Sequence, residues 1–262
     1  MKSVAVITGG AGLLGREHAI ALASDHSILL IDNDSEKLKG ALEAIHNELP
    51  GSDVYLLQCD ITSEHEVERA VNEICNLFDK IDVLINNAAL NPVPGIINPY
   101  NRFENFDPEQ WRNEYEVGLT GTLLMCKYVG RVMLKQKSGI VINIASDLSI
   151  IAPDQRIYVV DESSENFIKP ISYSIVKHGV IGLTKYLAAY WAPYGIRVNA
   201  LSPGGVETDQ PEIFKKNLRR LIPMNRMARK NEYREAIRFL SGPGSQYMTG
   251  HNLVIDGGRT IW

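Results

Sequence analysis

The chain has 262 residues, of which 45% are hydrophobic and 22% are charged. This composition is typical of a folded globular protein with a full core, and it excludes a disordered chain. The formal net charge of -4 argues against nucleic acid as the main partner.

The cysteines and the amino-terminal segment favour a cytoplasmic protein. Cys59, Cys75 and Cys126 are odd in number, far apart and set in apolar segments. They indicate reduced core thiols and no metal site or disulfide framework. The residues before the first apolar run are too few for a secretion signal, and we expect no membrane-spanning segment and no membrane partner.

The first predicted elements are a strand, a glycine turn and a helix. Residues 3–8 form a short β-branched run, which predicts a buried strand, and a helical pattern then continues to Ala23. Between them, Gly10, Gly12 and Gly15 fit the pattern G-x-G-x-x-G. Glycines let the backbone approach a pyrophosphate, and the N–H groups at the helix start face it. We interpret this turn as a dinucleotide cradle, with an ordinary strand-to-helix turn as the alternative.

The second predicted strand, residues 27–31, ends at Asp32. A carboxylate at this position suits the hydroxyls of a ribose and repels a 2′-phosphate, so it predicts NAD in preference to NADP. Asp32 or Asp34 could instead cap the next predicted helix, residues 35–49, and Asp34 fits that role better.

Strand and helix patterns alternate through the rest of the chain. Further strands are predicted at residues 54–58, 81–85, 139–144, 197–201 and 252–255, and helices at residues 63–78, 108–135, 175–191 and 231–240. The alternation implies right-handed crossovers between parallel strands. We predict one α/β domain over residues 1–262. Its fold is a Rossmann fold, a doubly wound parallel sheet of about seven strands with helices on both faces.

Three segments lie outside this alternation. Residues 91–107 are rich in Pro and Asn and predict a loop over the carboxyl ends of the strands, where ligand contacts gather. Residues 147–171 are irregular and charged, and a loop of this length is usually functional or mobile. Residues 212–230 are basic, which indicates either a solvated helix pair, the reading we favour, or a phosphate site on the substrate side.

Tyr173 and Lys177 form the candidate catalytic pair. On a helix, positions four apart share a face, so the phenol and the ammonium point the same way. A nearby cation stabilises a phenolate and lowers its pKa, which makes Tyr173 a candidate acid/base for an alcohol oxygen. Ser146, after the strand at residues 139–144, could donate a hydrogen bond to the same oxygen.

With these pieces in place, the chain resembles the classical short-chain dehydrogenase/reductase superfamily over nearly its whole length. The motifs that carry the resemblance are Thr8 to Gly15, Asp60, Asn86 to Ala89, Ser146, Tyr173 with Lys177, Asn199, Pro203 and Gly204 with Thr208, and the tail from Tyr247 to Gly258. The resemblance implies an NAD(P)-dependent oxidoreductase acting on CH-OH groups, in a homodimer or homotetramer.

The resemblance also implies roles for single residues. Asp60 and Ile61 would contact the adenine, Lys177 would hold the nicotinamide ribose, and the segment 203–208 would position the carboxamide. The full set of implied cofactor contacts is Gly9, Gly12, Leu14, Gly15, Asp32, Asn33, Asp60, Ile61, Asn87, Ala88, Ala89, Tyr173, Lys177, Pro203, Gly204, Val206 and Thr208.

Three departures from the superfamily's pattern stand out. Leu13 occupies a position where a glycine is expected, a spacing closer to that of sugar-nucleotide epimerases. Gly118 replaces the catalytic Asn, and we expect a helix bend there with a backbone carbonyl serving the proton relay. The interval from Ser146 to Tyr173 is about twice the usual one, which places an insertion beside the substrate. Tyr158 is closer to the usual interval but lacks a Lys four residues on, so we reject it as the base.

Polar residues near these segments predict a hydroxyl-rich substrate. They are Asn91, Asn98, Asp147, Asp154, Gln155, Arg156 and the basic run from Lys215 to Arg220. Residues 151–158 and 186–191 also resemble a subgroup tied to surface-polysaccharide and flagellin modification, which implies a sugar or sugar-nucleotide dehydrogenase. The alternatives are an epimerase or dehydratase that retains NAD, and a non-catalytic NAD-binding protein.

Overall fold

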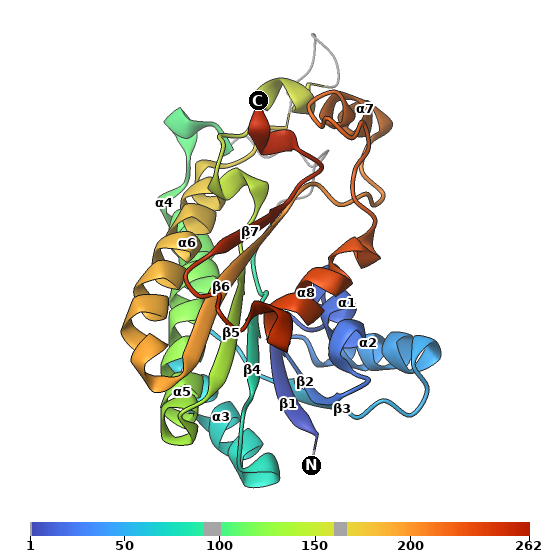
Figure 1. Ribbon diagram of the computed structural model, residues 1–262. Helices are drawn as coiled ribbons and strands as arrows, with labels where there is room; N and C mark the ends of the chain where they lie inside the picture. The colour runs from blue at the N-terminus through green and yellow to red at the C-terminus, as the bar shows by residue number, and fades with distance from the viewer. Residues whose placement is uncertain (1, 92–100, 160–166) are drawn as a thin grey trace.

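The computed structural model describes residues 2–91, 101–159 and 167–262. Its centre is one parallel sheet with the strand order β3-β2-β1-β4-β5-β6-β7 (Figure 1). The strands are β1 (Ser3–Thr8), β2 (His26–Asp32), β3 (Val54–Gln58), β4 (Val83–Asn86), β5 (Gly139–Ile144), β6 (Ile196–Pro203) and β7 (Asn252–Ile255). The predicted doubly wound Rossmann fold is therefore confirmed.

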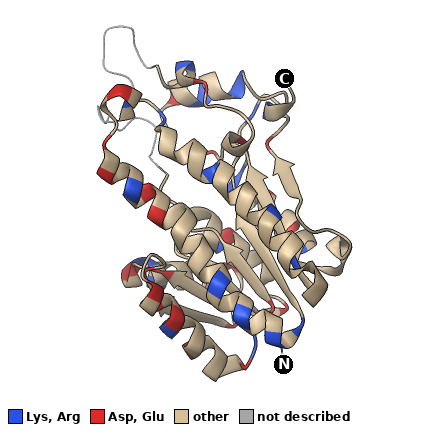
Figure 2. Cartoon of the chain, turned by 90° about the vertical axis from the view of Figure 1, so that its left-hand side faces the viewer, with Lys and Arg blue, Asp and Glu red and all other residues tan. Residues whose placement is uncertain are grey.

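Helices cover both faces of the sheet (Figure 1). One layer contains α1 (Leu13–Leu22), α2 (Ser35–Glu48) and α8 (Arg234–Ser241), and the other contains α3 (Glu64–Phe78), α4 (Pro108–Tyr115), α5 (Gly121–Gln136) and α6 (Ile171–Trp191). A further helix, α7 (Glu212–Arg219), lies beyond the carboxyl ends of the strands. On the face formed by α4, α5 and α6, acidic and basic residues are interspersed (Figure 2).

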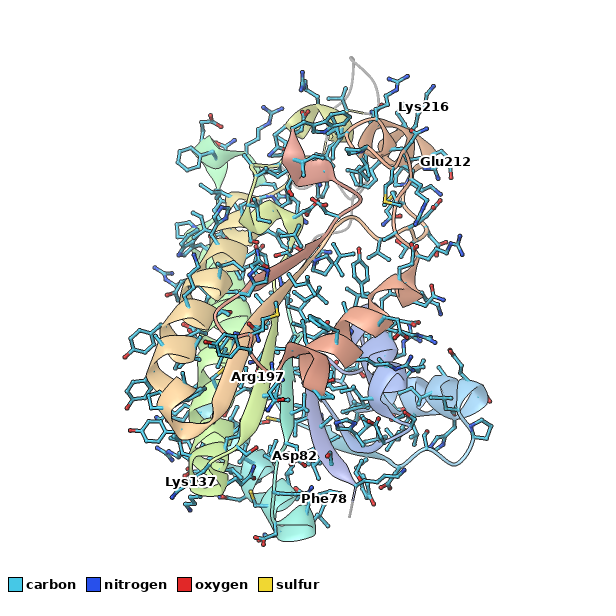
Figure 3. All side chains as sticks on the ribbon, viewed as in Figure 1. Phe78, Asp82, Lys137, Arg197, Glu212 and Lys216 are labelled. Atoms are coloured by element: carbon cyan, nitrogen blue, oxygen red, sulfur yellow. The ribbon has the colours of Figure 1, made fainter. Side chains whose placement is uncertain are left out.

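The sheet is buried on both faces because helices cover each side. The strands β1, β4 and β5 are therefore almost continuously apolar, as is usual for parallel strands. The register pairs Thr8 with Ile31 on one side and with Asn86 on the other, so β1, β2 and β4 end at the same edge. Asp82 and Lys137 mark the opposite edge (Figure 3). Every candidate site residue comes from the carboxyl edge or from the segments just after it.

The long helix predicted at residues 108–135 consists of α4 and α5 joined by a π-helical turn, Glu116–Thr120. The π turn contains Gly118, where a bend was predicted. By length and composition Pro108–Gln136 could cross a membrane, but 56% of its most apolar window is buried inside the molecule. This helix is therefore a core helix in the layer that contains α3, α4, α5 and α6.

Candidate functional site

The turn between β1 and α1 is a tight backbone cradle. Gly9 has φ of +59°, which favours glycine, and a Cβ there would lie 2.8 Å from Cα of Ala88. A Cβ on Gly15 would overlap the Gly9 carbonyl oxygen. The Gly12 N–H donates to that oxygen at 3.1 Å and closes the turn. The backbone at the start of α1 therefore faces the cleft, where a pyrophosphate can bind to it.

Asn87 holds the cradle against β4. Its side-chain amide donates to the carbonyl oxygens of Thr8 at 3.2 Å and Gly9 at 3.0 Å. In return, the Thr8 hydroxyl accepts from the backbone N–H groups of Asn87 and Ala88. These contacts tie β4 to the glycine turn at the point where the cofactor was predicted to pass.

Acidic side chains line the far end of the cleft from Tyr173. Asp32 ends β2, and its Oδ2 accepts from the Ala11 N–H at 3.2 Å, so its carboxylate faces the cradle. Asp60 and Ile61 follow β3 and line the same end, together with Asn33. A ribose bound beyond the cradle would meet a carboxylate there.

Ser146, Tyr173 and Lys177 line one cleft of about 600 Å³, which also includes the glycine cradle. Tyr173 and Lys177 lie one turn apart near the start of α6, while Ser146 follows the end of β5. The Lys177 ammonium donates to the Ile144 carbonyl at 2.8 Å and lies 5.8 Å from the centroid of the Tyr173 ring. The helix and the strand end thus bring the three predicted catalytic side chains together.

Burial has the largest effect on the pKa values of Tyr173 and Lys177. It raises the pKa of Tyr173 to about 12, although a hydrogen bond with Ser146 acts to lower that pKa. The negative charge of Asp147 raises the Tyr173 pKa further. Burial also lowers the pKa of Lys177 to about 8. The predicted lowering of the Tyr173 pKa is therefore wrong for the protein alone, because loss of solvation outweighs its partners.

The segment after β6 forms another wall of the cleft. Pro203, Gly204, Val206 and Thr208 line it, as predicted for a segment that positions a nicotinamide. The Thr208 N–H donates to the side chain of Gln210 at 2.7 Å, which holds the segment in place. Of the predicted cofactor residues, Gly15 does not line the cleft and acts through the turn instead.

Gly118 is fixed by packing. A Cβ at this position would overlap Cγ1 of Val176, so the Asn of the superfamily's pattern has no room here. The Gly118 carbonyl already accepts from the Thr122 hydroxyl at 2.9 Å. A π turn stands where the bend was predicted, and the carbonyl that was expected to serve a relay has a partner within its own helix.

Three charged residues in the cleft were not predicted as catalytic or cofactor residues. Asp147 accepts from the Ser146 hydroxyl at 2.9 Å and pairs with Arg259 at 2.6 Å, and both charged side chains are buried. Lys169 lies with its ammonium 3.8 Å from the centroid of the Tyr173 ring. A sequence signal existed for Lys169, because it precedes Tyr173 by the same four residues that separate Tyr173 from Lys177.

The predicted polar lining of the substrate end is wrong in part. Asn91 and Asp147 do line the cleft, but Arg156 pairs with Asp154 at the surface and Gln155 binds the backbone of Lys169. An apolar cluster fills this side instead: Ile157, Tyr158, Phe167, Phe214, Leu218, Ile222 and Met227. Asn98 lies outside the described residues. The described parts of 147–171 therefore pack against α7 through apolar and aromatic contacts of Ile157, Tyr158 and Phe167.

The basic residues of 212–230 do not line the cleft. Lys215 pairs with Glu212, Arg219 with Glu207 at 2.7 Å, and Arg226 with Glu232 at 2.6 Å. Only α7 forms a regular α-helix in this stretch, and it turns Phe214 and Leu218 toward the cleft. These ion pairs agree with the prediction that residues 212–230 are solvated, and they do not support a phosphate site there.

Known proteins resemble the chain over nearly its full length. Residues 11–260 match a family described as Enoyl-(Acyl carrier protein) reductase. A NAD-dependent glycerol dehydrogenase from Listeria innocua is 31% identical, with 98% of this chain and 94% of the relative covered.

Two solved structures show the same fold. One is NAD+-bound xylitol dehydrogenase, at a TM-score of 0.85 and 28% identity, covering 98% of each chain. The other is a gluconate 5-dehydrogenase from Burkholderia cenocepacia with NADP and tartrate, at 0.85 and 28%, covering 99% of this chain and 96% of that one.

Proposed function

Because the chain belongs to the short-chain dehydrogenase/reductase superfamily, it is a nicotinamide-dependent oxidoreductase of alcohols and ketones, and we propose that it uses NAD to oxidise a secondary alcohol of a small polyhydroxylated substrate. The observation that carries this proposal is the meeting of Ser146, Tyr173 and Lys177 in the cleft that contains the glycine cradle.

Each of these side chains has a distinct task. Tyr173 takes the proton of the substrate hydroxyl, and Ser146, which lines the same cleft, holds the same oxygen. Lys177 places a cation on the Tyr173 face of α6 and binds the nicotinamide ribose. The bound nicotinamide supplies the hydride acceptor. The low solvation of the site keeps water away from the proton transfer.

The cleft fits a dinucleotide and favours NAD. The glycine turn leaves no space for side chains at Gly9 and Gly15, which lets a pyrophosphate approach the start of α1. Asp32 presents its carboxylate beside this turn. A 2′-phosphate would meet that negative charge, whereas ribose hydroxyls can donate to it.

The substrate class rests on the relatives and on the polar groups around Tyr173. The similar proteins named above are dehydrogenases of glycerol, xylitol and gluconate, all of them polyhydroxylated. Asn91, Asp147 and Lys169 supply hydrogen-bonding groups at the Tyr173 end of the cleft. A role in surface-polysaccharide or flagellin modification has no support from these relatives and stays a prediction.

Assembly and location follow from the same proposal. We expect a cytoplasmic homodimer or homotetramer. Large apolar side chains are exposed on α5 and α6, namely Leu123, Ile175, Tyr186 and Tyr190. Exposed apolar groups gathered on neighbouring helices are typical of an interface between subunits.

The test is NADH formation with purified protein across a panel of polyols, aldonates and sugar nucleotides. We expect turnover of at least one small polyhydroxylated substrate, and a loss of about 100-fold or more in Tyr173→Phe, which lacks the proton acceptor. Tyr194→Phe, a change at an exposed tyrosine just after the same helix, is the matched control. Wild-type rates in Tyr173→Phe would refute the assignment of the base. Turnover without net NADH release would favour an epimerase or dehydratase.

A further inference from the structure

Lys169 is a buried lysine at the centre of the substrate end of the cleft. Only 6% of the residue is exposed, and that part lines the cleft beside Tyr173. Its ammonium donates to Oδ1 of Asn91 at 2.5 Å and lies 3.8 Å from the Tyr173 ring centroid. An ammonium group has three N–H donors. Among the described residues Asn91 is its one hydrogen-bond acceptor, so Lys169 has donors left for a ligand.

No carboxylate of the described residues neutralises the charge of Lys169. Within residues 2–91, 101–159 and 167–262, no Asp or Glu oxygen lies within 4.0 Å of its ammonium. The two nearest acidic influences, Glu114 and Asp147, are engaged elsewhere. Glu114 accepts from Ser172, and Asp147 pairs with Arg259. Buried lysines are rare unless they are paired.

Burial disfavours the charged form of Lys169. It lowers the pKa of Lys169 to about 7, against a partial opposing effect of Glu114 and Asp147, and with a further lowering from Lys177. An anion bound beside the ammonium would restore the charged form, because opposite charge within a few ångströms favours it.

Arg259, in the lining of the same cleft, has a second unsatisfied donor. It is 6% exposed and lines the cleft, and its Nη1 binds Asp147. Its Nε is buried without a hydrogen-bond partner within the described part of the chain. A buried N–H of this kind carries a desolvation penalty that a ligand oxygen would remove.

Among the residues that the structure describes, the buried charges around Tyr173 leave one positive charge in excess. The cations are Lys169, Lys177 and Arg259, and the carboxylates are Asp147 and Glu114, so three positive charges face two negative ones. A single carboxylate balances this excess, whereas a phosphate monoester carries about 1.5 to 2 negative charges at pH 7. The geometry and the charge both point to a monoanion.

We propose that Lys169 binds a carboxylate group of the substrate, with Arg259 adding positive charge to the lining of the same cleft, so that the preferred substrate is a polyhydroxy acid. The hydroxyl to be oxidised would lie at Tyr173 and Ser146, and the carboxylate would lie on the Lys169 side of the same cleft. Carboxylates form strong, charge-assisted hydrogen bonds with lysine and arginine. This inference rests on the proposed function and specifies its substrate.

The test compares each aldonate with the alditol of the same carbon skeleton, for chains of four, five and six carbons, using the full-length protein with NAD. We expect wild type to favour the aldonate by about tenfold or more in kcat/KM, mainly through KM, because the carboxylate forms a charge-assisted hydrogen bond that the alditol lacks. In Lys169→Met this preference should fall by about tenfold or more. Lys216→Met, at an exposed lysine on the outer side of α7 (Figure 3), should retain it.

Two kinetic results would overturn the subsite. One is a wild-type protein that prefers the alditol. The other is a Lys169→Met variant that loses the same factor on both members of a pair and shifts its pH profile, because Lys169 would then act through Tyr173. Calorimetric binding of aldonate and alditol to the NAD-saturated Tyr173→Phe protein, with and without Lys169→Met, tests the subsite independently of turnover. Equal binding of both compounds there would also overturn it, even if the proposed oxidation is correct.

Discussion

At the scale of single residues, burial and the two neighbours Ser146 and Asp147 shift the pKa of Tyr173 in different directions. Burial raises its pKa to about 12, the hydrogen bond with Ser146 lowers that pKa, and the charge of Asp147 raises it. Oxidation of an alcohol needs the phenolate, so the rate should rise with pH until Tyr173 is deprotonated. The positive charge of an oxidised nicotinamide acts in the direction that brings this pKa down.

We therefore expect two neighbouring substitutions to shift the pH profile of oxidation in opposite directions. In Ser146→Ala the alkaline rise of kcat/KM should move to higher pH, because Tyr173 loses a hydrogen bond that lowers its pKa. In Asp147→Asn the rise should move to lower pH, because a negative charge is removed. Profiles measured with saturating NAD would contradict this account if both variants moved the same way.

At the scale of elements, the contact between the π turn and α6 explains why this chain has Gly118. Val176 lies on α6 between Tyr173 and Lys177, and its Cγ1 occupies the space that a Cβ on Gly118 would need. A β-branched side chain on a helix has few alternative rotamers, so Val176 cannot easily move aside. π turns are frequent at functional sites, and here the turn brings two helices close beside the catalytic pair.

This packing predicts a specific stability pattern. Gly118→Ala should lower the free energy of unfolding by about 1–3 kcal/mol, the usual cost of overpacking. Gly182→Ala is the matched control, because nothing lies within 4 Å of its Cβ and it is inside α6. That control should be neutral or should raise stability by about 0.5–1 kcal/mol.

Denaturant unfolding measures both changes. The addition of Val176→Ala to Gly118→Ala should recover part of the loss, since the overlapping methyl group is removed. Strictly additive effects of the two substitutions would show that they do not meet in the folded protein.

At the scale of the whole molecule, the carboxy-terminal tail completes the site. Arg259 follows β7 and reaches Asp147, a residue 112 positions earlier. Trp262 donates from its indole to the Leu221 carbonyl at 3.1 Å, so the tail also contacts the segment after α7. The last residues therefore hold together the end of β5, the segment after α7 and the cleft between them.

Arg259→Met should destabilise the fold by about 3–5 kcal/mol, because a buried carboxylate at Asp147 would lose its partner. The double variant with Asp147→Asn should be less destabilised than the two single effects combined. Deletion of Trp262, which is largely exposed, is the control and should cost much less. Thermal unfolding of wild type, the two single variants and the double variant measures this coupling. Additive effects of Arg259→Met and Asp147→Asn would disprove it.

Features that depend on neighbours along the chain could be predicted from the sequence. The alternation of strands and helices, the glycine turn at Gly9–Gly15, the tip of β2 at Asp32 and the pairing of Tyr173 with Lys177 all follow from local periodicity and spacing. In the structure these residues lie at one edge of the parallel sheet, because strand direction alone brings them there.

Only the tertiary structure decided the electrostatics and the substrate side of the cleft. The partner of Asp147 comes from the other end of the chain, and the burial that lowers the pKa of Lys169 arises from segments that are separate in sequence. For the basic run around Lys216 the sequence favoured a solvated helix but left a phosphate site open, and the structure shows that α7 turns its apolar face to the cleft. Contacts between distant segments depend on how whole elements pack, and no local pattern of residue types contains that information.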